Sequence, residues 1–241
     1  MLFRSTPAFR GWKILRRDCA DRDAEGVPFR FAGPGVEADP FFTADGRRLY
    51  FISSRPDPPG KTADDLDIWY AERDRRGIWG APVRLPAPVN SAGQEWFPRA
   101  GRDGSLTFGS DRPGGFGATD IYSARQVRGR WEVRNLGGEV STSADDYEFE
   151  PSRDGRFAIL MSDGRLFRIG RKGAGWGGRE PLLPGAEGFH VGPLLSPSGR
   201  TLLFARGAAA GAGHSGELFR LDLGGTSENW PPACGTGAQR L

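Results

Sequence analysis

The chain has 241 residues, a formal net charge of +3 and an isoelectric point near 9.1. A length of about 200–250 residues suits a single all-β domain. Arginines are scattered among 30 acidic residues, with no basic run interleaved with aromatic residues, so no nucleic-acid partner is expected. No stretch approaches the roughly 18 apolar residues of a membrane-spanning helix, so no membrane span is expected either.

The chain begins with a basic segment, residues 1–26, that matches no later part of the sequence. It lacks the apolar core of about 7–15 residues that a secretory signal requires. We therefore treat residues 1–26 as an unassigned N-terminal extension. The next residues, 27–31, have the pattern of a short strand around Phe29.

A unit that contains a D-G turn then occurs four times. Each unit contains, in order, an acidic position, a Pro position, a turn and two strands. In some units another residue stands at the acidic position or at the Pro position. The turns lie at Asp45, Asp103, Asp154 and Ser198, which are 58 (45 to 103), 51 (103 to 154) and 44 (154 to 198) residues apart. A D-G pair flanked by apolar alternation is a strong hairpin signal. A spacing of about 40–50 residues between sets of short strands is typical of propeller blades.

A second piece, with a Trp followed by polar and apolar alternation, follows the first three units. It lies at 77–91, 129–143 and 173–185, with Trp79, Trp131 and Trp176. We interpret it as an outer edge strand whose indole covers its blade. The piece is missing after the fourth unit, so we expect the strand near Phe29 to complete the last blade and close the ring. Residues 224–241 are expected to form a flexible tail.

The runs FFTADGRRLYFISSRP, GSDRPGGFGATDIYSAR and LSPSGRTLLFARG resemble the repeats of the TolB-like family of bacterial β-propellers, which are WD-repeat-like in shape. The resemblance covers residues 37–223 and departs from the pattern at Phe149, Arg165 to Phe167, His190 and Ser198. It implies an all-β propeller of four-stranded antiparallel blades, four of them recognisable, either complete or part of a larger ring. It also implies a periplasmic location. Since this chain has no signal peptide, either it stays in the cytoplasm or its true start lies upstream.

Candidate hydrolytic and metal-binding residues are few. The imidazoles are His190 and His214, and His214-Ser215 lacks the nucleophile elbow of a serine hydrolase. Cys19 and Cys234 lie outside the repeats and form no zinc motif. They are either two free thiols or a disulfide between the ends of the ring. We predict no catalytic residue, no metal and no cofactor.

The acidic residues form two columns with two interpretations each. Glu37, Glu95 and Asp146, with His190 in the fourth unit, either line the channel mouth or accept hydrogen bonds from backbone N–H groups at the start of each innermost strand. Asp67 and Asp120 either bind calcium or cap the Gly-rich loops, and no calcium-loop motif supports the first. We predict a binding site at the channel mouth formed by Glu37, Glu95, Trp96, Asp146, His190 and Phe116, while Phe51, Phe108, Ile121 and Phe204 pack between blades.

The sequence therefore predicts a monomeric, non-enzymatic scaffold that binds a protein or peptide partner, TolB-like and in the bacterial cell envelope. The alternative is a carbohydrate-processing, glycosidase-type propeller enzyme that uses carboxylates in the channel.

Overall fold

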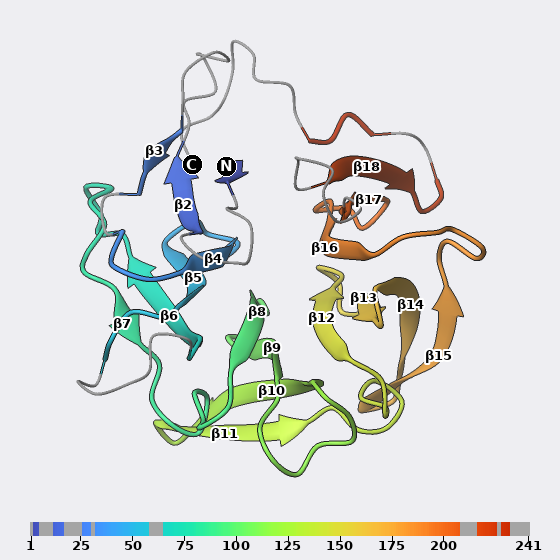
Figure 1. Cartoon of the computed structure of the whole chain (residues 1–241), viewed down its shortest axis with the longest axis horizontal. Helices are drawn as coiled ribbons and strands as arrows, with labels where there is room; N and C mark the ends of the chain where they lie inside the picture. The colour runs from blue at the N-terminus through green and yellow to red at the C-terminus, as the bar shows by residue number, and fades with distance from the viewer. Residues whose placement is uncertain are drawn as a thin grey trace.

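The computed structural model describes residues 2–4, 12–16, 26–29, 32–57, 65–207, 216–225 and 228–231. Within these ranges all regular secondary structure is β, in five antiparallel sheets arranged around a central axis (Figure 1). None of the described residues forms a helix of the length and apolarity needed to cross a bilayer. The predicted all-β propeller with four recognisable blades is confirmed.

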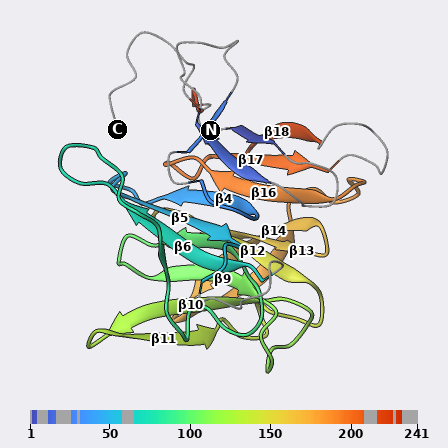
Figure 2. The same cartoon turned by 60° about the vertical axis from the view of Figure 1, so that its left-hand side comes forward.

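Three blades have four strands each, in sequence order from the axis outward. The first consists of β4 (Glu37–Phe42), β5 (Arg48–Ser53), β6 (Asp67–Glu72) and β7 (Val83–Arg84); Figure 2 brings this side of the ring forward. The second consists of β8 (Glu95–Ala100), β9 (Leu106–Ser110), β10 (Asp120–Val127) and β11 (Arg130–Asn135). The third consists of β12 (Asp146–Pro151), β13 (Phe157–Ser162), β14 (Arg165–Lys172) and β15 (Gly175–Pro181). The fourth has three described strands, β16 (His190–Leu195), β17 (Thr201–Arg206) and β18 (Glu217–Asp222).

The four predicted turns join the two innermost strands of each blade. Their glycines have φ between 66° and 77°, a region that favours a residue without a side chain: Gly46, Gly104, Gly155 and Gly199. The side chain before each glycine accepts a hydrogen bond from the backbone N–H two residues further on, as at Asp45 with Arg47 (3.0 Å) and Ser198 with Arg200 (3.2 Å). All four turns therefore lie at the same end of their blades, which we call the turn face. We call the opposite end, where the innermost strands begin, the start face.

Apolar side chains fill the space between neighbouring sheets. Phe51, Phe108, Ile121 and Phe204 are buried, which confirms their predicted packing role. The indoles of the outer strands β11 and β15 also cover their blades. Trp131 packs on the cluster between the first two blades, and Trp176 meets the buried ring of Phe149 edge-on at 5.0 Å.

The N-terminal sheet corrects the predicted ring closure. It consists of β1 (Leu2–Arg4), β2 (Lys13–Arg16) and β3 (Val27–Pro28), and β3 pairs with β2 instead of with β18. Ile14 and Phe29 pack on Leu49, Phe51 and Trp69 of the first blade. The strand near Phe29 is therefore committed to its own sheet and does not complete the last blade.

Backbone hydrogen bonds identify which blade positions the N-terminal strands occupy. The residue before the third strand of a blade accepts from the first residue of the next innermost strand, as Leu66 does from Glu95 (2.9 Å) and Thr119 from Asp146 (3.0 Å). Trp12, which precedes β2, accepts from Glu37 in the same way (2.8 Å). β2 thus holds a third-strand position. β1 and β3, which flank β2, therefore correspond to the second and fourth strands of a blade. The three described strands of the fourth blade, β16 to β18, correspond to the first, second and third strands.

Several expectations fall outside the described residues. Cys19, His214 and Cys234 are among them, as is most of the 224–241 tail, of which the structure describes 224–225 and 228–231.

Candidate functional site

The acidic column at the start of the innermost strands is buried and hydrogen-bonded. Each carboxylate accepts from the backbone N–H four residues earlier: Glu37 from Gly33 (2.7 Å), Glu95 from Ser91 (3.2 Å) and Asp146 from Thr142 (2.7 Å). Each is at most 1% exposed. The interpretation that these acids bond backbone N–H groups at the strand start is confirmed.

An arginine of the same blade pairs with each of these acids. The pairs are Arg55 with Glu37, Arg112 with Glu95 (3.0 Å) and Arg179 with Asp146 (2.7 Å). Burial raises the pKa of Glu95, and hydrogen bonds from Ser91 together with the Arg112 charge oppose that rise. All three carboxylates are buried and paired with an arginine, although one oxygen of Glu37, Oε2, has no hydrogen-bond partner. They are therefore not part of an exposed surface.

The other predicted site residues lie in different environments. His190 is 4% exposed and packs edge-on against Phe204 at 5.5 Å between ring centroids. Trp96 is half-buried against the core between the first two blades. Phe116 is 56% exposed in the loop before β10. The structure thus does not join Trp96, Phe116 and His190 into one accessible surface.

The second acidic column forms local contacts. Asp120 accepts hydrogen bonds from the N–H groups of Phe116 (2.6 Å) and Gly117 (3.2 Å), which confirms the loop-capping interpretation. Asp67 pairs with Arg84 of the outer strand (2.9 Å). Among the described residues, no three His, Cys, Asp or Glu side chains are placed to hold a metal ion.

A different set of carboxylates lies along the innermost strands, two of them, Asp39 and Glu148, at β-bulges. We call Asp39, Glu148 and Glu150 the channel carboxylates. Each accepts a hydrogen bond from a backbone N–H of the next blade. Asp39 accepts from Phe97 (3.2 Å), Glu148 from Gly192 (2.6 Å) and Glu150 from Leu195 (3.3 Å). These bonds tie the first blade to the second and the third to the fourth.

Arg99 is the cation of this region. Its side chain is buried, pairs with Glu150 of the third blade and lies over the ring of Phe41 of the first blade, 5.1 Å from the ring centroid. Arg99 belongs to the second blade, so it links three innermost strands. Its charge also opposes the rise in the pKa of Glu150 that burial causes.

The surroundings of Asp39 and Glu148 raise the pKa values of both carboxyl groups. Burial raises the pKa of Asp39 to about 6, against the effect of the Phe97 N–H and the Arg99 charge. Burial, and next the charge of Asp39, raise the pKa of Glu148 well above its usual value. One carboxylate oxygen of Glu148, Oε1, is buried without a hydrogen-bond partner. Groups with such shifts are typical of functional sites, although structural networks produce them too.

Three rings form a row near the start face, which we call the aromatic row: Phe97, Tyr147 and Phe189. The centroids of Phe97 and Tyr147 are 5.7 Å apart, and those of Tyr147 and Phe189 are 6.4 Å apart. Phe97 and Tyr147 are half-buried, whereas Phe189 is 48% exposed. The row crosses from the second blade through the third to the segment that leads into β16.

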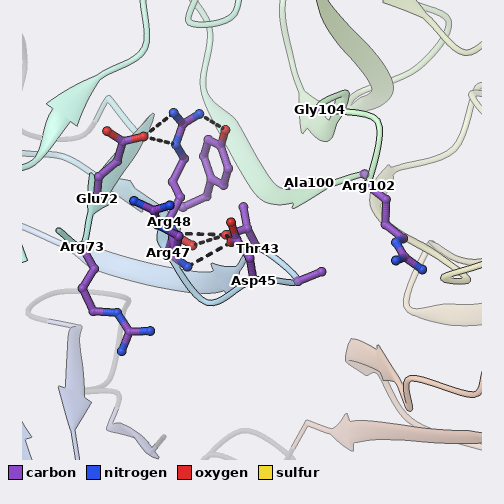
Figure 3. A pocket seen from close by; sticks show the side chains of 12 residues that line it. Thr43, Asp45, Arg47, Arg48, Glu72, Arg73, Ala100, Arg102 and Gly104 are labelled. Carbon is purple, nitrogen blue, oxygen red and sulfur yellow. Dashed lines mark hydrogen bonds and ion pairs between the residues drawn. The ribbon is translucent and has the colours of Figure 1, made fainter. Parts of the chain in front are cut away.

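The turn face carries two cavities. The larger has a volume of about 510 Å³ and lies between the 43–48 turn of the first blade and the 100–104 turn of the second (Figure 3). Four arginines line it: Arg47, Arg48, Arg73 and Arg102. The smaller, of about 200 Å³, shares Arg102 and extends to the turns of the third and fourth blades.

Sequence reasoning missed the channel carboxylates and the aromatic row. A bulge changes which side chains face the axis, and a period-2 pattern does not locate it. A usable signal was that the blades differ at one equivalent position. Two residues after the first residue of the innermost strand, the four blades have Asp39, Phe97, Glu148 and Gly192.

No family model matches the chain, and no curated protein matches it significantly. Solved structures do. A protein described as TolB from Agrobacterium tumefaciens is 18% identical with a TM-score of 0.56 over 82% of this chain and 66% of its own. An α-L-arabinofuranosidase from Lactobacillus brevis is 12% identical with a TM-score of 0.54 over 91% and 85%. A prolyl endopeptidase is 14% identical with a TM-score of 0.50 over 92% and 30%.

The chain therefore spans about two thirds of that TolB structure and under a third of the prolyl endopeptidase. At these identities the similarity shows the propeller fold. TolB-like and glycosidase structures are both among the neighbours.

Proposed function

We propose that this chain is a non-enzymatic binding scaffold that holds a protein or peptide partner at the start face of its channel. The observation that carries the proposal is the aromatic row. Aromatic side chains that are partly exposed on a rigid support supply much of the binding energy at protein interfaces. Phe97 and Tyr147 stand on innermost strands, and Phe189 extends the row towards solvent.

The charges next to the row indicate what the partner brings. Burial is the main cause that raises the pKa of Tyr147, and the neighbouring acidic residues Glu148, Asp145 and Asp39 raise it further. The acidic residues next to this hydroxyl make the potential around it negative wherever they are ionised. The row therefore favours an apolar or aromatic side chain flanked by a cation, such as a peptide segment that contains Lys or Arg.

The TolB-like repeats and the TolB structure among the neighbours support an envelope partner as part of this proposal. Cell fractionation of a bacterium that expresses the tagged full-length protein tests the location. Recovery in the cytoplasmic fraction would contradict it without affecting the binding role.

The binding test uses the purified chain as bait on solubilised envelope proteins, followed by titration with the captured partner. Phe189→Ala and Tyr147→Ala are expected to weaken binding at least about tenfold, as hot-spot truncations do. Phe116→Ala is the matched control, because Phe116 is also exposed but lies outside the row. Equal affinity in all four proteins would refute the aromatic row as the binding surface.

A carbohydrate-processing enzyme is the second candidate, favoured by the raised pKa values of Asp39 and Glu148. Glycoside hydrolysis needs one carboxyl group that stays protonated to donate to the leaving group and one carboxylate that acts as base or nucleophile. Glu148 would serve as the acid and Asp39 as the second group.

A screen of chromogenic glycosides, including arabinofuranosides, separates the two functions. Turnover that disappears in both Glu148→Gln and Asp39→Asn, with unchanged circular dichroism, would establish the enzyme and overturn the scaffold. Partner binding without turnover would support the scaffold.

A further inference from the structure

The larger cavity of the turn face lies at the opposite end of the strands from the aromatic row. Its lining contains four arginines against two acidic residues, Asp45 and Glu72. We propose that this cavity is a second binding site, for a small ligand that carries two oxyanion groups. The proposal does not depend on the function proposed for the start face.

The two acidic residues of the cavity have partners of different kinds. Glu72 pairs with Arg48, whose guanidinium also donates to the Tyr50 hydroxyl (2.9 Å). Asp45 accepts from the hydroxyl of Thr43 (2.6 Å) and from the N–H of Arg47 (3.0 Å) within its own turn. Figure 3 shows both sets of bonds. Glu72 is thus committed to Arg48, and Asp45 is held within its own turn, where its charge faces Arg47.

Arg47 and Arg102 are the residues that a ligand would meet. Both are exposed, and within the described part of the chain neither guanidinium forms an ion pair. They come from the turns of two different blades. In Figure 3, Arg73 and Arg102 lie on opposite sides of the 43–48 turn. Arg73 also lies over the Trp79 ring at 5.7 Å, which holds its charge near the cavity wall.

The chemistry of guanidinium sets the ligand class. Its planar fork binds a carboxylate or a phosphate through two parallel hydrogen bonds. Two such groups on separate turns call for two oxyanions on one ligand. A volume of about 510 Å³ lies within the range of about 300–1,000 Å³ usual for small-molecule sites.

The smaller cavity supports the same assignment. Arg102 lines both cavities, and the smaller one adds Arg153 from the turn of the third blade. Arginines thus line the turn face from the first blade to the third, with Asp154 as the acidic residue of the smaller cavity. A ligand bound to Arg47 and Arg102 would therefore have a further arginine, Arg153, on the side of the smaller cavity.

The test is calorimetric titration of the whole chain with inorganic pyrophosphate and, separately, with succinate, at low salt. We expect saturable binding of at least one probe, a loss of about tenfold in affinity in Arg47→Gln and in Arg102→Gln, and no detectable binding in the double variant. Pyrophosphate alone would assign a phosphate ligand, succinate alone a dicarboxylate, and both a general oxyanion site.

The control variant is Arg134→Gln, which removes an exposed arginine from the outer strand β11 without touching the cavity. Thermal unfolding verifies that every variant is folded. The proposal is overturned if neither probe binds, if the two cavity variants bind as the unchanged protein does, or if Arg134→Gln weakens binding as much as they do.

Discussion

Arg99 is the residue on which the electrostatics of the channel depend. It is buried, and its guanidinium is the partner of Glu150, which is 5% exposed. Removal of one member of a buried ion pair leaves the other charge without compensation. The ring of Phe41 adds a cation–π contact at 5.1 Å. This one side chain therefore joins charge compensation to packing between three blades.

We expect Arg99→Met to lower the free energy of unfolding by about 3–5 kcal/mol, the usual effect of breaking a buried pair. Urea denaturation monitored by circular dichroism measures it. The control is Arg125→Met, which breaks an exposed pair with Asp103 and should cost at most about 1 kcal/mol. The double variant Arg99→Met/Glu150→Met should recover much of the loss; an equal or larger loss would show that the arginine acts through packing alone.

Asp39 predicts a pH dependence of stability with a defined sign. Its pKa in the folded protein is about 6, above the ordinary value of 3.8, so between these two values the folded state binds more protons than the unfolded state. The free energy of unfolding therefore falls as pH rises from about 4 to 6. Other acids contribute too, and Asp103 has the opposite sign because hydrogen bonds from Ser105 lower its pKa.

The comparison that isolates Asp39 is the difference between the unchanged protein and Asp39→Asn, measured by urea denaturation from pH 4 to pH 7. The amide mimics the protonated carboxyl and still accepts from the Phe97 N–H. We expect the variant to gain stability relative to the unchanged protein as pH rises. A difference that does not vary with pH would contradict the raised pKa.

These residues also mark the limit of sequence reasoning at this scale. The acids at the strand starts were identified because they repeat, and their repetition reflects a shared structural role. Asp39 and Phe97 have φ of 51° and 47° within bulges, a conformation that no local pattern of hydrophobicity announces. The functional candidates were missed because they differ from blade to blade.

At the scale of elements, two glycines illustrate two different constraints. Gly104 lies in a D-G turn with φ of 77° and has open space around the position of a Cβ atom. Gly109 lies in β9, and a Cβ atom there would stand 2.5 Å from the backbone oxygen of Tyr147 in the third blade. The first constraint is conformational, whereas the second sets the spacing between the second and third blades.

Gly104→Ala should therefore cost about 1 kcal/mol, from backbone strain alone. Gly109→Ala should cost more, because backbone must move and the packing between blades opens. Parallel urea denaturation of the two variants measures the difference. A smaller loss for Gly109→Ala than for Gly104→Ala would indicate that β9 and β12 separate at little cost.

The turns and strands were the part that the sequence predicted well. The D-G turns, the innermost hairpins and the Trp-containing outer strands β11 and β15 depend on neighbouring residues, which local patterns describe. In the first blade Trp79 precedes the outer strand β7. The closure of the ring was predicted wrongly. Val27–Pro28 pairs with β2 and not with β18 because Ile14 and Phe29 pack on the first blade, which a local sequence pattern does not reveal. The segment before residue 26 has no D-G turn, so nothing in it suggested a further sheet.

At the scale of the whole molecule, the sheets follow one another around the ring and each packs on its sequence neighbours. In such arrays stability is close to a sum of unit and interface terms, so units at the ends are the least supported. The N-terminal sheet and the fourth blade have three described strands each, and the three blades between them have four.

Amide hydrogen exchange should reflect this order. We expect the slowest exchange in β5, β9 and β13, and faster exchange in β2 and β17, because the end sheets open without disturbing the rest. Mass spectrometry of peptic fragments resolves the five sheets. Uniform protection across all of them would mean that the ring unfolds as one unit and would refute the stepwise picture.

The bulge contacts have a consequence for how such a protein can be rebuilt. The blades share the same backbone arrangement. The contact between one innermost strand and the next nevertheless differs along the first three blades: Asp39 with Phe97, Arg99 with Glu150, and Glu148 with Gly192. A duplicated second blade inserted after the original would set Arg99 against another arginine at the position of Glu150. Blade order is thus encoded in the charges around the axis, and blades of similar shape are not interchangeable.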